Sequence, residues 1–272
     1  MSASTRRSRR DRGASALLLG LALLGASGCS RPEPARNEVV VSAASSLADA
    51  VGALAAAYAS VDSTVTITPN FGSSGTLAQQ IRQGAGVDLY LAASDREMDL
   101  LEREGLIEPG TRRVLASNEL VLVVAAGEEK GVRAMVDLAG EGVERIAIGA
   151  PASVPAGEYA REMLERLGLW DRVASKAVLA SNVRQALTYV ERGEVDAGLV
   201  YRTDALRSPG VVVVATAPAG SHRPIHYPAA RVAAGANREA ALRFLEFIAG
   251  PDGEARFRAL GFGPPSRARG GS

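Results

Sequence analysis

Short apolar runs alternate along the chain with segments whose apolar residues recur at helical spacing. Residues 38–44 form a β-branched, apolar run, which predicts a buried strand. In residues 47–58 the apolar positions recur every three or four residues, which predicts a helix with one packed face. This order of strand and helix repeats, so the sequence predicts an α/β protein whose parallel or mixed sheets are covered on both faces by helices.

The same patterns predict the remaining elements. Further strands are expected at residues 64–71, 87–93, 119–125, 145–149, 178–180, 197–201, 211–215 and 226–232. Further helices are expected at residues 76–83, 95–104, 156–167, 183–191, 238–248 and 253–260. Glycines follow several of these helices and predict their ends; they are Gly84, Gly105, Gly168 and Gly193.

Residues 1–28 have the pattern of an export signal. Five arginines in residues 1–12 precede an apolar or small run at 14–26, which is too short to span a bilayer as a helix. An arginine pair, Arg6 and Arg7, leaves a twin-arginine signal open as an alternative, although the residues after the pair do not fit it well. The segment predicts a cleaved leader that is absent from the folded domain.

Small residues stand immediately before Cys29, which is the only cysteine of the chain. This pattern resembles the lipobox of bacterial lipoproteins, in which the cysteine is lipidated and becomes the mature N-terminus. Ala26 stands where leucine is usual, and an ordinary secretory signal is the alternative. We therefore expect a lipid anchor at Cys29, a flexible tether over residues 29–38, and a periplasmic or cell-surface location.

Composition narrows the classes of function. One cysteine excludes a disulfide framework and a multi-cysteine metal site, and it leaves no cysteine nucleophile in the folded domain. Because the leader carries five arginines and one aspartate, the residues after it have a net charge of −3, against +1 for the whole chain. This balance predicts no basic patch, and we expect no nucleic-acid partner.

The candidate chemistry lies in five separated segments at strand ends or helix starts. They offer hydroxyl and backbone N–H groups and hardly a charged side chain. Helix N-termini bind anions through unpaired N–H groups and the positive end of the helix dipole. The pattern predicts a site that holds a small oxyanion by hydrogen bonds. The segments are Ser45-Ser46-Leu47, Gly72-Ser73-Ser74-Gly75-Thr76, Val154-Pro155-Ala156-Gly157, Asn182-Val183-Arg184 and Leu199-Val200-Tyr201.

Each of these segments taken singly has a plainer interpretation. Ser46 and Ser74 are interpreted as helix N-caps, Pro155 as an ordinary helix start, and Tyr201 as a core tyrosine with a satisfied hydroxyl. Arg184 lies beside the site, where it adds to the field or caps a helix, and it is left out of the candidate set. Taken together and in this order, the segments favour a binding site.

The two histidines, His222 and His226, have no cysteine or carboxylate cluster beside them in the sequence, so we interpret them as surface or strand residues and not as metal ligands. A Gly-Xaa-Ser-Xaa-Gly elbow and a phosphate-binding P-loop are both missing from the sequence. We accordingly nominate no catalytic residue and no cofactor, and expect a binding protein and not an enzyme.

Over residues 39–262 the chain resembles the periplasmic molybdate-binding proteins of ABC transporters. The resemblance implies a two-lobed type II periplasmic binding protein fold with the ligand in the cleft between the lobes. It implies lobe 1 at residues 39–117 plus 217–265, and lobe 2 at 118–216. Crossing segments are expected near 116–120 and 213–217. The matching stretches are Ala43-Ala44-Ser45-Ser46-Leu47, Phe71-Gly72-Ser73-Ser74-Gly75-Thr76-Leu77-Ala78, Val87-Asp88-Leu89, Val154-Pro155-Ala156-Gly157-Glu158-Tyr159-Ala160, Asn182-Val183-Arg184 and Gly198-Leu199-Val200-Tyr201.

The resemblance also implies a role for each ligand residue. Ser46 and Ser74 supply a hydroxyl and a backbone N–H, Ala156 and Val183 supply a backbone N–H, and Tyr201 supplies its phenol O–H. Molybdenum is then bound only as the oxyanion, through these same residues. The chain departs from the family pattern at Gly75, where a third serine is frequent, and at Asn182, where an acidic residue is frequent; neither change removes a ligand.

The implied function is capture of molybdate, with tungstate as a second ligand, and delivery to an ABC permease by a monomer. Lobe closure on the ligand is expected. One alternative is a binding protein for sulfate or another tetrahedral oxyanion. A second is an enzyme on the same two-lobed fold, such as porphobilinogen deaminase, which holds its cofactor through a cysteine that this domain lacks. A third is a purely structural surface lipoprotein.

Overall fold

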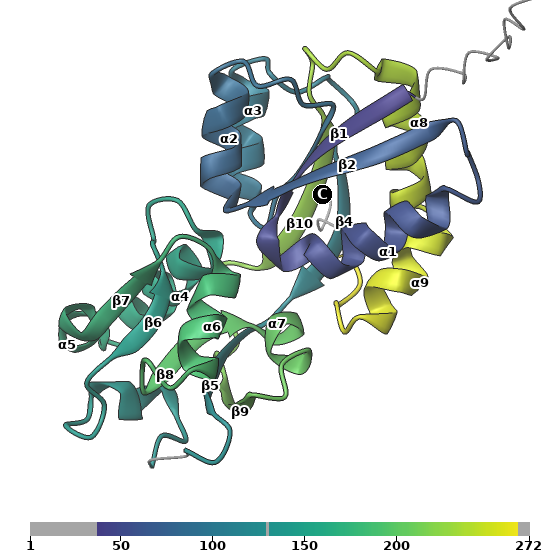
Figure 1. The fold of residues 1–272 in the computed structure, drawn as a ribbon. Helices are drawn as coiled ribbons and strands as arrows, with labels where there is room; N and C mark the ends of the chain where they lie inside the picture. Colours follow the sequence, from purple (N-terminus) through teal and green to yellow (C-terminus); the bar gives the residue numbers. More distant parts are fainter. Residues whose placement is uncertain (1–36, 129–130, 266–272) are drawn as a thin grey trace, which may run out of the picture. The chain divides into compact units, whose positions relative to one another are not determined.

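The computed structural model describes residues 37–128 and 131–265, which form two five-stranded sheets covered by helices (Figure 1). We call the part built on the first sheet lobe 1 and the part built on the second sheet lobe 2. Cys29 and the tether up to residue 36 lie outside the described residues. Within the described part, no helix is both long and apolar enough to cross a membrane.

The sheet of lobe 1 has the strand order β2-β1-β3-β10-β4. β1 runs parallel to β2 and β3, whereas β10 runs antiparallel to β3 and β4. The strands are β1 (Asn37–Ala44), β2 (Val65–Gly72), β3 (Leu89–Leu91), β4 (Arg113–Asn118) and β10 (Ile225–Arg231).

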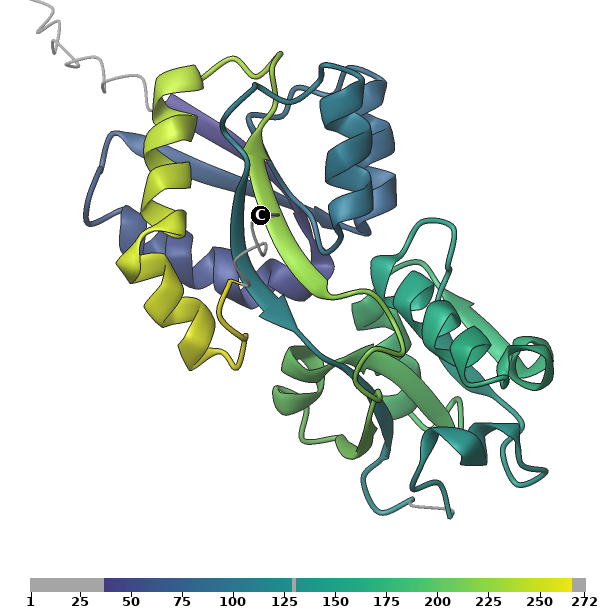
Figure 2. The ribbon, with the colours of Figure 1, turned by 180° about the vertical axis from the view of Figure 1, so that it is seen from behind.

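Helices cover both faces of this sheet, with α2 and α3 on one side and α8 and α9 on the other (Figure 2). β3 shows how the sequence separates the two faces: Leu89 and Leu91 join the core under α1 and α8, and Tyr90 between them joins the core under α2 and α3. The helices are α1 (Ala48–Tyr58), α2 (Ser74–Arg82), α3 (Asp95–Arg103), α8 (Arg238–Ala249) and α9 (Pro251–Ala259).

Lobe 2 repeats this plan with the strand order β7-β6-β8-β5-β9. β6 runs parallel to β7 and β8, and β5 runs antiparallel to β8 and β9. Its strands are β5 (Leu120–Ala125), β6 (Ile146–Gly149), β7 (Ala177–Ala180), β8 (Ala197–Tyr201) and β9 (Val211–Thr216). Its helices are α4 (Pro155–Arg166), α5 (Trp170–Val173), α6 (Val183–Glu191) and α7 (Arg202–Leu206).

The chain crosses between the sheets twice. Only Glu119 separates β4 from β5, and residues 217–224 lead back from β9 to β10. Each crossing delivers an antiparallel strand into the receiving sheet, since β5 lies between β8 and β9 and β10 lies between β3 and β4. The predicted lobe boundaries, at 117 and 217, concern which residues move together as a rigid body. They stay predictions.

The predicted strands and helices are present, with bounds that shift by a few residues, but several short features differ, among them two further 3-10 helices, η2 (Met135–Ala139) and η3 (Ala174–Lys176). The sequence patterns missed β4, α5 and α7, and the helix expected at 47–58 begins as a 3-10 turn, η1 (Ser45–Leu47). β4 is an edge strand whose only partner strand is β10, with one isolated bridge from Ser117 to Gly263, and it keeps polar residues at its ends, so its apolar pattern is weak. α5 and α7 have four and five residues, too few for helical periodicity to show.

Candidate functional site

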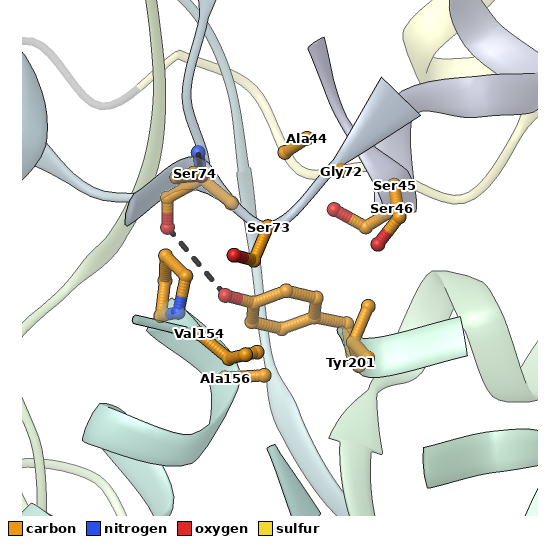
Figure 3. Close-up of a pocket in the computed structure, with 12 residues that line it drawn as sticks. Ala44, Ser45, Ser46, Gly72, Ser73, Ser74, Val154, Ala156 and Tyr201 are labelled. Atoms are coloured by element: carbon orange, nitrogen blue, oxygen red, sulfur yellow. Dashed lines mark hydrogen bonds between the residues drawn. The ribbon is translucent and has the colours of Figure 1, made fainter. Parts of the chain in front are cut away.

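A small pocket lies among the starts of η1, α2, α4 and α6 (Figure 3). All five predicted ligand residues line it. Parallel strands β1, β2, β6 and β7 each lead directly into one of these helix starts, and ligands of α/β sheets commonly bind at such strand ends. The lining residues are Ala44, Ser45, Ser46, Gly72, Ser73, Ser74, Ala93, Val154, Pro155, Ala156, Val183 and Tyr201.

None of the described residues that line the pocket carries a charge. Its polar groups are therefore hydroxyls and main-chain groups. Such neutral donors, fixed at helix starts, suit an anion that must be held without a formal cation.

At the start of α2, the helix is capped by Ser73 and not by Ser74. Ser73 Oγ accepts from the N–H of Thr76 at 3.2 Å, which satisfies one of the unpaired donors of the first turn. Ser74 Oγ instead accepts from the N–H of Ala93 at 3.0 Å, and Ser74 is fully buried. The N-cap interpretation of Ser74 is therefore wrong, since its Oγ accepts from Ala93 and not from an N–H of its own helix.

Ser46 does not cap its helix either. The N-cap position of α1 is Leu47, and no side chain caps η1 or α1. Ser46 Oγ accepts from the hydroxyl of Tyr227, 3.3 Å away in β10, and only 3% of Ser46 is exposed. The N-cap interpretation of Ser46 is thus also wrong.

In lobe 2, the sequence builds two helix starts with different devices. α4 has Pro155 at its first position, where a missing N–H costs nothing, and Val154 before it offers no side-chain cap. α6 is capped by Asn182, whose Oδ1 accepts from the N–H of Gln185 at 3.0 Å. Because asparagine caps helices as well as aspartate does, the departure from the family pattern at this position keeps the cap.

The capping bonds leave particular backbone N–H groups free. In α2, α4 and α6 the acceptors at the helix start take N–H groups from the third helical position, at Thr76, Gly157 and Gln185. Helical geometry then gives the N–H groups of Ser74, Ala156 and Val183 no acceptor within their own helices. Together with the N–H of Ser46, these are the N–H groups predicted to bind the anion.

Tyr201 ends β8 and is 1% exposed. Its hydroxyl donates to the carbonyl of Ala93 in lobe 1 at 3.5 Å, the dashed line of Figure 3. This distance is at the long limit for a hydrogen bond, so the hydroxyl can turn to a better acceptor at little cost. Burial raises the pKa of Tyr201 well above its ordinary value, and the phenol therefore stays a donor.

Beside the pocket, the two lobes touch through backbone atoms. The N–H of Gly75 in α2 donates to the carbonyl of Ser153 at 3.0 Å. A Cβ atom on Gly75 would lie 2.6 Å from that carbonyl oxygen, closer than real Cβ atoms approach. The glycine that stands in place of the family's serine thus permits this close approach.

Ion pairs join the lobes on either side of the pocket. Arg96 of α3 donates from Nη1 to Glu158 of α4 at 2.8 Å and from Nη2 to the Ala152 carbonyl at 3.3 Å. On the other side, Asp49 of α1 contacts Arg184 at 2.6 Å and Arg207 at 2.9 Å. Burial by itself would raise the pKa of Asp49, but these two guanidinium groups hold it below its ordinary value.

Arg184 uses its charge outside the pocket. Its Nη2 meets Asp49, and its Nε lies 2.6 Å from the buried carboxylate of Asp204 in α7. The two histidines lie elsewhere: His226 in β10 pairs with Asp95 at 2.7 Å, and the ring of His222 lies 5.6 Å from that of Tyr159.

Sequence reasoning missed the groups of three residues that hold the pocket residues in place. They are the N–H and carbonyl of Ala93, the hydroxyl of Tyr227, and the amide of Asn118, which donates to that hydroxyl. Tyr227 is 181 positions from Ser46, and its strand pattern indicates only a strand. No local signal in the sequence could have joined these residues.

The family model for bacterial extracellular solute-binding proteins matches residues 39–263. The chain belongs to this family. The match covers nearly all of the described residues, including both sheets and every residue that lines the pocket.

Two relatives and one solved structure resemble this solute-binding protein over most of its length. "Putative ABC transporter substrate-binding lipoprotein YvgL" of Bacillus subtilis (strain 168) is 40% identical over 89% of this chain and 94% of its own. The molybdate-binding protein ModA of Escherichia coli (strain K12) is 38% identical over 83% of this chain and 89% of its own. The solved periplasmic molybdate-binding protein of Azotobacter vinelandii superposes with a TM-score of 0.76 at 26% identity, over 84% of this chain and all of that one.

These likenesses confirm two of the predictions. The resemblance to molybdate-binding proteins of ABC transporters is confirmed by relatives at this level of identity. The fold prediction, mixed sheets covered by helices in the manner of type II periplasmic binding proteins, is confirmed by the structural match and the two observed sheets.

Proposed function

We propose that this solute-binding protein captures molybdate outside the cytoplasm and delivers it to an ABC permease. The observation that carries the proposal is the uncharged pocket in which hydroxyls and free helix-start N–H groups converge from both lobes. The identity to ModA over most of both chains supports the same ligand. Capture is binding without a covalent step, so the proposal includes no enzymatic activity.

Five residues hold the anion in this proposal. Ser46 and Ser74 donate from hydroxyl and backbone N–H, Tyr201 donates its phenol O–H, and Ala156 and Val183 donate backbone N–H groups. Molybdenum enters only as part of the oxyanion and contacts no side-chain ligand directly. The protein needs no other cofactor.

Ligand size and protonation set the proposed selectivity. Tungstate has nearly the same size, charge and shape as molybdate, so a ring of neutral donors binds both. Sulfate has shorter bonds to oxygen and is held more loosely by donors spaced for the larger anion. Hydrogen phosphate carries an O–H that needs an acceptor, and a buried polar group without a partner costs about 1–3 kcal/mol.

The proposal extends to the protein's setting. A lipid at Cys29 and the tether after it would keep a monomer near its permease, and the name of the relative YvgL as a lipoprotein supports this anchor. Metabolic labelling with a fatty acid analogue would test it, with Cys29→Ser as the control that should lose the label.

Isothermal titration calorimetry of the purified domain with molybdate, tungstate, sulfate and phosphate tests the ligand. We expect tight binding of the first two, weak binding of sulfate and still weaker binding of phosphate, which competition at high phosphate concentration detects. The melting temperature should rise with molybdate, because a ligand that binds only the folded state stabilises it. Tight sulfate binding with no response to molybdate would instead support the sulfate-binding alternative.

A further inference from the structure

One hydrogen-bonded chain leads from the first crossing between the lobes to Ser46. The backbone N–H of Glu119 donates to Oδ1 of Asn118 at 2.9 Å. Nδ2 of Asn118 donates to the hydroxyl of Tyr227 at 2.9 Å, and this hydroxyl donates to Oγ of Ser46 at 3.3 Å. Tyr227 is fully buried and Ser46 nearly so, which shields the last of these bonds from water.

The direction of donation along these hydrogen bonds is fixed at the backbone N–H of Glu119. A backbone N–H can only donate, so Asn118 must turn Oδ1 toward Glu119 and Nδ2 away from it. The two hydrogens of Nδ2 are then used by Tyr227 and by Oγ1 of Thr203 in lobe 2, which is also 2.9 Å away. The amide of Asn118 is thereby fully used and held from both lobes.

The donor and acceptor roles of Tyr227 and Ser46 follow from the orientation of the Asn118 amide. The Tyr227 hydroxyl accepts from Asn118 and has its own hydrogen left for Ser46. Because Ser46 Oγ accepts that hydrogen, the serine does not direct its own hydrogen at Tyr227 and keeps it for a ligand in the pocket that it lines.

Ser74 receives its direction from a shorter chain. The backbone N–H of Ala93 donates to Ser74 Oγ at 3.0 Å, which leaves the hydrogen of that hydroxyl for the pocket as well. Each serine hydroxyl is thus oriented by a chain that starts at a backbone N–H. Only the chain to Ser46 runs through side chains that substitution can alter.

We propose that Asn118 and Tyr227 are positioning residues that hold the Ser46 hydroxyl as a donor toward the anion, and that they thereby favour fully deprotonated oxyanions over hydrogen phosphate. The inference rests on the proposed function, because it concerns how the same pocket selects its ligand. A pocket whose hydroxyls are held as donors leaves the hydrogen of hydrogen phosphate without an acceptor. A Ser46 hydroxyl that is free to turn can supply one.

The first test removes the hydroxyl of Tyr227 and keeps its ring. In Tyr227→Phe, the affinity for molybdate should fall about tenfold, the effect of about one hydrogen bond. The ratio of molybdate affinity to phosphate affinity should fall by more than about tenfold. Both affinities are measured by calorimetry and by competition, at a pH where hydrogen phosphate prevails. The matched control is Tyr58→Phe, a buried tyrosine of the same lobe whose ring also packs edge-on against a phenylalanine, and whose residue does not line the pocket. It should change neither quantity.

The second test reverses the direction of the chain. In Asn118→Asp, one carboxylate oxygen still accepts from Glu119, and the other faces Tyr227 as an acceptor. The Tyr227 hydroxyl then donates to the carboxylate and accepts from Ser46, which turns the serine hydrogen away from the anion. Molybdate affinity should fall at least about hundredfold, from the loss of a charge-assisted hydrogen bond and the added negative charge.

A double-mutant cycle separates these two effects, because the added charge acts whether or not Tyr227 has a hydroxyl. In the Tyr227→Phe background, Asn118→Asp should cost at least about tenfold less affinity than it does alone. Additive losses, or a Tyr227→Phe protein that matches Tyr58→Phe in both quantities, would overturn the positioning role. If Asn118→Asp does not fold, as judged by its ligand-free melting curve, the phosphate ratio of Tyr227→Phe decides alone.

The wild-type titration keeps the two proposals apart. If wild type binds molybdate but the affinity losses of Asn118→Asp and Tyr227→Phe are additive, the positioning role is removed and the proposed function is left intact. Wild-type protein that binds none of the four anions removes both.

Discussion

The two lobes contribute to the same pocket with different chemistry. Lobe 1 contributes Ser46 and Ser74, whose hydroxyls are oriented by Tyr227 and by the N–H of Ala93. Lobe 2 contributes Ala156 and Val183, which have only main-chain groups to offer, and the phenol of Tyr201. In lobe 1 the identity of the side chain decides what the ligand meets, whereas in much of lobe 2 the path of the backbone decides it.

This difference determines how each lobe can be tested. A side-chain truncation removes a donor from lobe 1 directly. In lobe 2 the equivalent change must remove an N–H group without disturbing the helix start that presents it. The predictions below are arranged by the size of the expected effect on anion affinity.

The largest effect is expected from the double substitution Ser46→Ala and Ser74→Ala. Each loses a hydrogen bond to a charged ligand, worth about 1.5–3 kcal/mol, so affinity should fall by at least about hundredfold in calorimetry. Ser208→Ala is the control, since Ser208 is a buried serine that bonds to Glu191 away from the pocket. A loss no larger than that of the control would remove the side-chain role of lobe 1.

The second prediction concerns the backbone of lobe 2. Val183→Pro places proline at the first position of α6, where it is well tolerated, after an extended Asn182 that suits a following proline. It deletes one N–H, so affinity should fall about 10- to 100-fold. Val183→Ala keeps the N–H and should lose less than about tenfold. Equal losses in the two variants would show that the side chain, and not the N–H, is what the anion needs.

The third prediction uses the place where the lobes meet. The added methyl of Gly75→Ala would collide with the Ser153 carbonyl, so the lobes should close less completely and affinity should fall about tenfold. The ligand-free protein should melt no lower, because alanine favours a helix over glycine by up to about 1 kcal/mol. Gly52→Ala in α1, where a Cβ meets nothing within 4 Å, should raise the melting temperature and leave affinity unchanged. A Gly75→Ala protein that binds as tightly as wild type would show that this contact is not needed for closure.

The smallest effect is expected from Asp49→Asn, which removes the ion pairs to Arg184 and Arg207. Both Asp49 and Arg184 are about a third exposed, so the contact is worth at most about 1 kcal/mol and affinity should fall no more than about fivefold. Raising the salt concentration should reduce the difference from wild type. The two guanidinium groups hold the pKa of Asp49 below its ordinary value in the folded protein, so the stability that the Asp49 carboxylate contributes is present above that ordinary value and is lost as the pH falls through the lowered pKa. A difference from wild type that persists in high salt and at a pH below the lowered pKa of Asp49 would contradict this account.

Much of the fold could be predicted from the sequence, because strands such as β1 and β8 are continuous apolar runs and helices such as α6 have clear periodicity and caps. The edge strand β4 could not, since β10 is its only partner strand and its polar ends leave the apolar pattern weak. The short helix α7 has five residues, too few for helical periodicity to show.

The candidate site could be predicted as a set of residues, and the structure brings all five to one pocket. The roles of their neighbours could not. Nothing in the sequence distinguishes Ser73 as the cap from Ser74 as the pocket hydroxyl, since either serine can cap a helix and only the position of the Ala93 N–H separates them. The link from Tyr227 to Ser46 depends on how β10 is placed in the sheet, which is a tertiary property.

The uncharged lining of the pocket has a consequence for the conditions in which the protein can work. Outside the cytoplasm, a cell has little control over the ionic strength of its surroundings. Salt weakens attractions between exposed charges, whereas buried hydrogen bonds are screened far less. A protein that holds its anion with buried hydroxyls and N–H groups should therefore keep much of its anion affinity at both low and high salt concentration. A protein that relied on exposed arginines would lose more of its affinity as the salt concentration rose.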